Sequence, residues 1–86
     1  MLTQSQVETK IKSILAATLC VDEKVIEKQK DLRRDLGMDS FDEIMLATGI
    51  EDEFGFDFDD NSFFQLNTVD ELYNYVNNLV VEKQTA

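Results

Sequence analysis

The chain has 86 residues with 18 acidic and 8 basic side chains, a formal net charge of −10, and no histidine, tryptophan or proline. Its length predicts a single domain over residues 1–86 with a small hydrophobic core, and its charge argues against binding to nucleic acid or to anionic membranes. No apolar run is long enough to span a bilayer and no signal segment opens the chain, so we expect a cytoplasmic protein without membrane insertion, or one of an organelle matrix without its presequence.

The first periodic segment predicts a helix over residues 5–19. Ser5 followed by Glu8 forms a possible capping box at its start. The apolar positions at helical spacing are Val7, Ile11, Ile14, Leu15 and Thr18. Cys20 comes next; as the sole cysteine it cannot form an internal disulfide, and we expect it to be buried or half-buried, as free cysteines usually are.

A long polar connection over residues 21–39 separates this helix from the next. Its apolar side chains are predicted to anchor the connection in the core; they are Val25, Ile26, Leu32 and Leu36. Gly37 is free to adopt a positive φ, so residues 36–39 are interpreted as a turn that leads into a helix.

The second helix is predicted over residues 40–54, with Gly55 ending it in the C′ position. At a rotation of about 100° per residue, the helix has two apolar faces. One face carries Phe41, Ile44, Met45 and Thr48, and the opposite one carries Leu46, Ala47, Ile50 and Phe54. A surface helix needs only one apolar face. We therefore assign the second face to the core and the first to partners, with cover by neighbouring loops as the alternative.

The remaining chain predicts a short helical turn at residues 62–66 and a last helix from about Thr68 to Val81, where Thr68 and Glu71 form another capping box. The single apolar stripe of the last helix is Val69, Leu72, Tyr73, Val76, Leu79 and Val80. Three main helices and one short helix predict an all-α bundle with a long connection between helices 1 and 2.

Ser40 opens the second helix, and Glu43 completes a Ser-x-x-Glu pattern with it. From the residues alone, Ser40 is therefore an N-cap, or a first-turn residue behind an Asp39 N-cap. No histidine is present to activate its hydroxyl, and the chain offers neither a convincing nucleophile–base pair nor a histidine-containing metal site. This composition argues against an enzyme.

Residues 35–42, with the sequence Asp-Leu-Gly-Met-Asp-Ser-Phe-Asp, resemble the phosphopantetheine attachment motif of acyl carrier proteins. The acidic segment 51–54, the segment 58–60 and the pair 68–69 resemble later parts of that family in order and spacing. The resemblance implies a free-standing carrier rather than an enzyme. Its 4′-phosphopantetheine arm would be attached to Ser40 by a phosphopantetheinyl transferase, and acyl groups would travel on the arm as thioesters.

The resemblance also implies roles for residues around Ser40. Asp39 would help to hold the metal ion during transfer of the arm, although an acid in a first helical turn is favoured whatever the function. The residues assigned to docking are Phe41, Ile44 and Met45 on the apolar face, Glu43 and Glu51 as acids around it, and Asp42, for which the resemblance also implies this role. The candidate lining of an acyl pocket is Leu46, Ala47, Ile50, Leu66, Leu72 and Tyr73, which an ordinary core also explains.

The expected partners are fatty-acid, lipid or polyketide-type enzymes that transfer, condense or tailor an acyl cargo, and the chain itself is expected to be a monomer. Residues 1–34 have a net charge of +2 and residues 35–86 a net charge of −12, which favours partners with basic docking patches. Several residues depart from the family pattern and leave open a specialised rather than a general pathway; they are Arg33, Arg34, Phe41, Met45 and Gly49.

Two other functions remain as alternatives. One is a carrier-like interaction subunit that binds partner helices and never uses its arm. The other is a calcium-binding module, because Asp57-x-Asp59-x-Asn61 begins like an EF-hand loop. That loop pattern then fails, since Ser62 stands at the glycine position and Thr68 at the position of the bidentate glutamate.

Overall fold

The computed structural model describes residues 3–58 and 60–85. Its elements in chain order are α1 (Gln4–Leu19), the 3₁₀ turn η1 (Glu23–Val25), α2 (Ser40–Phe54), α3 (Asp60–Phe64) and α4 (Val69–Thr85). Among the described residues every regular element is helical, apart from one isolated bridge between Asp31 and Thr68. The predicted all-α bundle of three main helices and one short helix, with a long connection between the first two, is confirmed.

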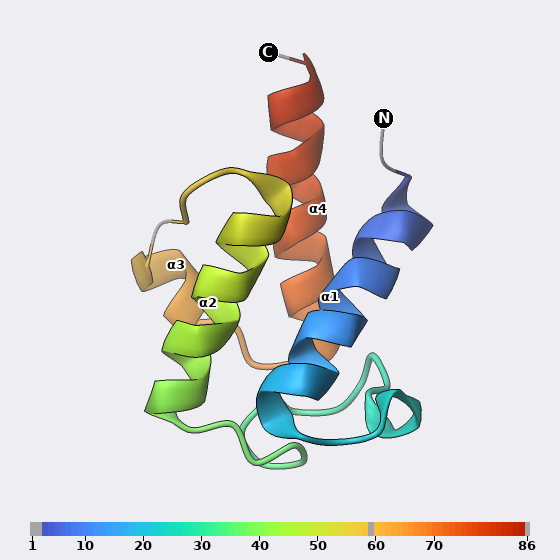
Figure 1. Ribbon diagram of the computed structural model, residues 1–86, viewed down its shortest axis with the longest axis vertical. Helices are drawn as coiled ribbons and strands as arrows, with labels where there is room; N and C mark the ends of the chain where they lie inside the picture. The colour runs from blue at the N-terminus through green and yellow to red at the C-terminus, as the bar shows by residue number, and fades with distance from the viewer. Residues whose placement is uncertain (1–2, 59, 86) are drawn as a thin grey trace.

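Helix α1 packs against both α2 and α4, and Figure 1 shows α2 between α1 and α3. The long connection crosses the end of the bundle where α1 stops and α2 starts. In the described part of the chain, no helix is long and apolar enough to cross a membrane.

Helix α1 begins one residue earlier than predicted and uses a different cap. Thr3 is the N-cap: its hydroxyl accepts from the Gln6 N–H at 3.2 Å, and its own N–H donates to Gln6 Oε1 at 2.9 Å. The predicted Ser5–Glu8 box is wrong because both residues already lie inside the helix. Cys20 ends the helix in a left-handed conformation (φ 56°) and is exposed, so its predicted burial is also wrong: this terminal residue lies at the surface.

The connection between α1 and α2 is held by three of its four predicted anchors. Ile26 and Leu32 are buried and Leu36 is half-buried against the core. Val25 is 45% exposed, so its predicted role as an anchor is wrong. Its neighbour Ile26 takes the inward position after the 3₁₀ turn, which leaves Val25 outside. Gly37 has the expected positive φ, 74°.

Helix α2 has the predicted bounds and the predicted two faces. Its buried side chains are Leu46, Ala47 and Ile50, and Phe54 is half-buried against them. On the other side, Phe41 is 72% exposed, Ile44 58% and Met45 47%. No described loop covers the face of Phe41, Ile44 and Met45, so the alternative of an enclosed helix is ruled out for the described chain. Gly55 closes the helix with a φ of 77°.

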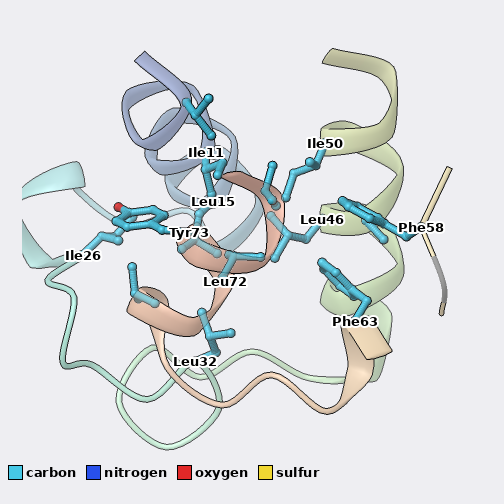
Figure 2. Close-up of a cluster of buried hydrophobic side chains, with 14 of the residues drawn as sticks. Ile11, Leu15, Ile26, Leu32, Leu46, Ile50, Phe58, Phe63, Leu72 and Tyr73 are labelled. Carbon is cyan, nitrogen blue, oxygen red and sulfur yellow. The ribbon is translucent and has the colours of Figure 1, made fainter. Parts of the chain in front are cut away.

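Helices α3 and α4 contribute the remaining buried side chains of the core. The predicted capping box of α4 is confirmed: the Glu71 N–H donates to the Thr68 hydroxyl at 3.1 Å, and the Thr68 N–H donates to Glu71 Oε1 at 3.0 Å. Helix α3 lies two residues earlier than predicted; Phe63 within it is buried, and Leu66 beyond its end is half-buried. Figure 2 shows Leu72 at the centre of the buried cluster.

Candidate functional site

Ser40 is the first residue of α2 and is exposed. The helix is capped by Asp39: Asp39 Oδ1 accepts from the Asp42 N–H at 2.8 Å, and the Asp39 N–H donates to Asp42 Oδ2 at 3.3 Å. The predicted Ser40–Glu43 box is therefore wrong, and the alternative with an Asp39 N-cap is correct. Within the described chain, the Ser40 hydroxyl has no hydrogen-bond partner, so it is free to react.

The surroundings of Ser40 favour an attached anion and offer no catalytic base. The first N–H groups of a helix have no partner within the helix, and the positive end of the helix dipole stabilises negative charge there. The sequence contains no histidine. The Asp39 carboxylate beside Ser40 is already engaged in the cap. The start of α2 therefore suits an anionic group on the Ser40 hydroxyl.

An exposed apolar face continues from Ser40 along α2. It consists of Phe41, Ile44 and Met45, the residues predicted to face a partner. Asp52 is exposed and falls within about 20° of Phe41 around the helix at 100° per residue. The apolar face thus has an acidic residue on the same side, near the far end of the helix.

The three acids predicted for docking bond within the chain. Glu43 Oε1 is 2.6 Å from Arg33 Nη2 and accepts from Arg33 Nε at 2.7 Å. Glu51 Oε2 accepts from the Phe58 N–H at 2.8 Å. Asp42 completes the cap of α2. These three carboxylates therefore fasten α2 and its neighbouring segments, a role that the sequence reasoning missed.

A groove of about 320 Å³ runs beside the exposed face of α2. It is lined by Ile44, Ala47, Thr48, Glu51, Phe58 and Phe64. Of the predicted pocket residues, only Ala47 lines this groove; Leu46, Ile50 and Leu72 are fully buried in the core, and Leu66 is half-buried. The sequence reasoning missed Phe58 and Phe64 as lining. The alternation of Phe56 and Phe58 was the available signal for Phe58, because alternation is typical of an extended segment with one buried face.

Tyr73, another predicted pocket residue, lies elsewhere. Figure 2 shows its ring beside Ile26, on the far side of Leu72 from Leu46. Its hydroxyl is buried and has no hydrogen-bond partner among the described residues. Burial, and then the negative charges of Glu8 and Glu23, raise the pKa of Tyr73 to about 12. The structure therefore does not bring Tyr73 together with the residues of α2.

The candidate calcium loop is only partly covered, because Asp59 lies outside the described residues. Among the residues that are described, no group of three or more histidine, cysteine, aspartate or glutamate side chains is arranged to hold a metal ion.

Comparison with known proteins gives consistent similarities over most of the chain. The family described as "Phosphopantetheine attachment site" matches residues 9–76. The chain is 33% identical over 79 residues to an acyl carrier protein of Thermosynechococcus vestitus, covering 92% of this chain and 98% of that protein. It is 37% identical to an acyl carrier protein of Phaeodactylum tricornutum (79% of this chain, 90% of that protein) and 34% identical to one of Thermotoga maritima (88% and 94%).

Proposed function

The chain belongs to the acyl carrier protein family, whose members carry acyl groups on a phosphopantetheine arm, and we propose that Ser40 is the residue to which this arm is attached. As a member of that family it is a carrier rather than an enzyme. The observation that supports Ser40 is its exposed hydroxyl at the start of α2, behind a cap made by Asp39.

The residues around Ser40 fit a phosphodiester. The arm supplies a terminal thiol on which the acyl group is held as a thioester. The start of α2 stabilises the negative phosphate through the helix dipole and the first N–H groups. Asp39 caps the helix by accepting from the Asp42 N–H, and we assign it a second role beside the metal ion that the transferase uses.

We propose that partner enzymes contact the exposed face of Phe41, Ile44 and Met45. Large apolar side chains that are exposed together on one face are typical of interaction sites. Phe41 and Met45 make this face more apolar than the family pattern, which supports a specialised set of partners. Acids around the face, and Asp52 on the face itself, would steer basic partners toward it.

Intact-protein mass spectrometry tests the attachment site. The protein is incubated with coenzyme A, magnesium and a broad-specificity phosphopantetheinyl transferase, beside the variants Ser40→Ala and Ser13→Ala. Ser13 is an exposed serine within α1 and serves as the matched control. We expect the wild type and Ser13→Ala to gain one phosphopantetheine each and Ser40→Ala to gain none.

Two results would overturn this assignment. Loading of Ser40→Ala would place the arm on another residue. A wild-type protein that stays unmodified with several transferases would leave Ser40 as an ordinary residue of the first turn and favour an interaction subunit that works without an arm.

Charge steering is tested at Asp52, because reversing the charge of Glu43 or Glu51 would also break bonds within the chain. We expect the transferase to load Asp52→Lys with phosphopantetheine more slowly than the wild type at low salt. The difference should disappear as the salt concentration rises, since salt screens surface charges. The neutral Asp52→Asn should show about half of the effect. Equal loading rates at low salt would remove Asp52 from the docking surface.

A further inference from the structure

Arg33 joins three segments of the chain that are distant in sequence. Its Nε donates to Glu43 Oε1 on α2 at 2.7 Å, its Nη1 to the Leu66 carbonyl at 2.8 Å and its Nη2 to the Phe64 carbonyl at 2.9 Å. The Glu43 side chain is only 12% exposed and that of Arg33 35% exposed. A planar guanidinium with donors in a fixed fork can serve a carboxylate and two carbonyls at once, which a lysine cannot.

The turn that carries Arg33 is itself held in place. The Asp31 carboxylate accepts from the backbone N–H groups of Arg34 at 2.8 Å and Arg33 at 3.0 Å, and these bonds lower the pKa of Asp31 below its ordinary value. The Leu32 N–H donates to the Asn67 carbonyl at 2.7 Å. Arg33 is therefore presented from a fixed turn rather than from a free loop.

Helix α3 depends on contacts at its two ends. It has five residues, too few to be stable as an isolated helix. Before it, the Phe58 N–H is bonded to Glu51 of α2, and Phe58 stacks on the buried Phe63 with ring centroids 4.9 Å apart. At its C-terminal end, the two carbonyls of Phe64 and Leu66 are held by Arg33.

The C-terminal end of α3 is also a wall of the groove beside α2. Phe64 lines the groove from that end, opposite Ile44 and Ala47 of α2. Moving the backbone of Phe64 outward to widen the groove would pull its carbonyl away from Arg33. Since hydrogen bonds to charged groups are stronger than neutral ones, Arg33 opposes this movement.

We propose that Arg33 is a latch that holds the end of α3 against α2, and that it thereby limits how much of an acyl cargo enters the groove. The part of this inference that concerns the cargo rests on the proposed carrier function. The latch itself does not, because it is a property of the folded chain. Arg33 acts as a positioning residue: it sets the place of Phe64 without lining the groove.

Amide hydrogen exchange tests the latch in the unmodified protein. The variants are Arg33→Gln and Arg34→Gln, which remove the same charge from adjacent residues; Arg34 is exposed and is the matched control. The probes are the N–H groups of Gln65 and Leu66, which donate to Ser62 and Phe63 at the end of α3. We expect Arg33→Gln to speed their exchange about tenfold, with Val76 in α4 unchanged, and Arg34→Gln to leave all three unchanged.

The result that overturns the latch is equal exchange of Gln65 and Leu66 in the two variants. If Arg33→Gln instead loosens the whole chain, so that Val76 exchanges faster as well, Glu43→Gln supplies the milder change. It keeps an acceptor for Arg33 but removes the charge, and should speed exchange at Gln65 and Leu66 alone. Acceleration that is again spread over α4 would show that Arg33 supports the whole fold, against the proposal.

A second measurement connects the latch to the cargo. Each variant is loaded with an octanoyl-bearing arm, and cleavage of the thioester by hydroxylamine is followed. If releasing the latch admits more of the octanoyl group into the groove, the thioester on Arg33→Gln should be cleaved more slowly than the thioester on Arg34→Gln. Normal loading with equal cleavage would refute the control of the cargo and leave the carrier function intact. Failure of all variants to load would refute the carrier function, and the exchange experiment would still decide the latch.

Discussion

Asp39 and Asp42 cap α2 reciprocally, with the Asp42 N–H 2.8 Å from Asp39 Oδ1 and the Asp39 N–H 3.3 Å from Asp42 Oδ2. The serine between them takes no part in this cap. Stability and attachment chemistry are thus assigned to adjacent residues, which makes them separable by mutation.

The cap predicts that substitutions of Asp39 and Ser40 differ in their effect on the free energy of unfolding. Asp39→Ala should lower the free energy of unfolding by about 1 kcal/mol, because it removes an N-cap. Ser40→Ala should change it by less than about 0.5 kcal/mol, as surface substitutions do. Asp39→Asn should retain the stability, since asparagine caps about as well, yet slow the loading if the carboxylate contributes to metal binding. Urea unfolding measures the stability of the three variants, and the mass-spectrometric assay measures loading. A loss of stability in Ser40→Ala as large as that in Asp39→Ala would contradict the Asp39 cap.

The exposed apolar face predicts a loss of association without a loss of stability. Phe41 is 72% exposed, so Phe41→Ser should leave the urea midpoint nearly unchanged. Removing a large aromatic anchor from a docking surface should lower kcat/KM for arm loading by about tenfold. The control is Val25→Ser, which removes another exposed apolar side chain away from this face. If both variants load equally well, Phe41 is not in the contact.

Gly49 predicts a coupling between α2 and α1. A Cβ at Gly49 would lie 3.1 Å from Ile14 Cγ2, closer than an ordinary contact. Gly49→Ala should gain about 1 kcal/mol from helix propensity, and overpacking against Ile14 should cancel most of it. In an Ile14→Ala background, Gly49→Ala should raise the free energy of unfolding by nearly the full amount of about 1 kcal/mol that helix propensity gives. Unfolding of the four proteins in a double-mutant cycle measures the coupling, which should exceed about 0.5 kcal/mol; an additive result would exclude the contact.

Tyr73 predicts a loss of stability in alkali. Its pKa is raised from 10.0 to about 12 in the folded chain. Below pH 10 both states are protonated and stability is unaffected; between pH 10 and 12 the unfolded state releases the proton first, so stability falls as pH rises. The expected loss is on the order of 2 kcal/mol.

The variant Tyr73→Phe isolates this effect. It lacks the buried hydroxyl that has no partner among the described residues, so at pH 7 it should be at least as stable as the wild type. Its stability should also fall less than that of the wild type between pH 10 and 12. Parallel curves for the two proteins would show that the hydroxyl is solvated in the folded chain.

Local patterns predicted most of the fold. The bounds of α2, the Thr68–Glu71 cap and the two faces of α2 all depend on residues within a few positions of one another. Side-chain periodicity and capping chemistry act over that range, so the sequence carries them directly. The same holds for the attachment motif around Ser40, whose residues are contiguous.

The errors in the interpretation of the sequence have two origins. Cys20 and Val25 were assigned to the interior from general preferences of their residue types, and both are exposed at the ends of helical segments. Tyr73 belongs to the apolar stripe of α4 as predicted, but the stripe is wide enough for its members to face different helices. A periodic pattern identifies the buried side of a helix and does not identify the neighbour on that side.

The sequence by itself determined the helices, most of the core and the place of Ser40 in the first turn of α2. The tertiary structure decided how α2 is joined to its neighbours: Glu43 binds Arg33, Glu51 binds the Phe58 N–H, and Arg33 reaches a carbonyl 33 positions away at Leu66. Charged residues on a helix surface look alike in a sequence. Their partners depend on which segments folding brings together, because a hydrogen bond needs its donor and acceptor atoms within roughly 3.5 Å of each other.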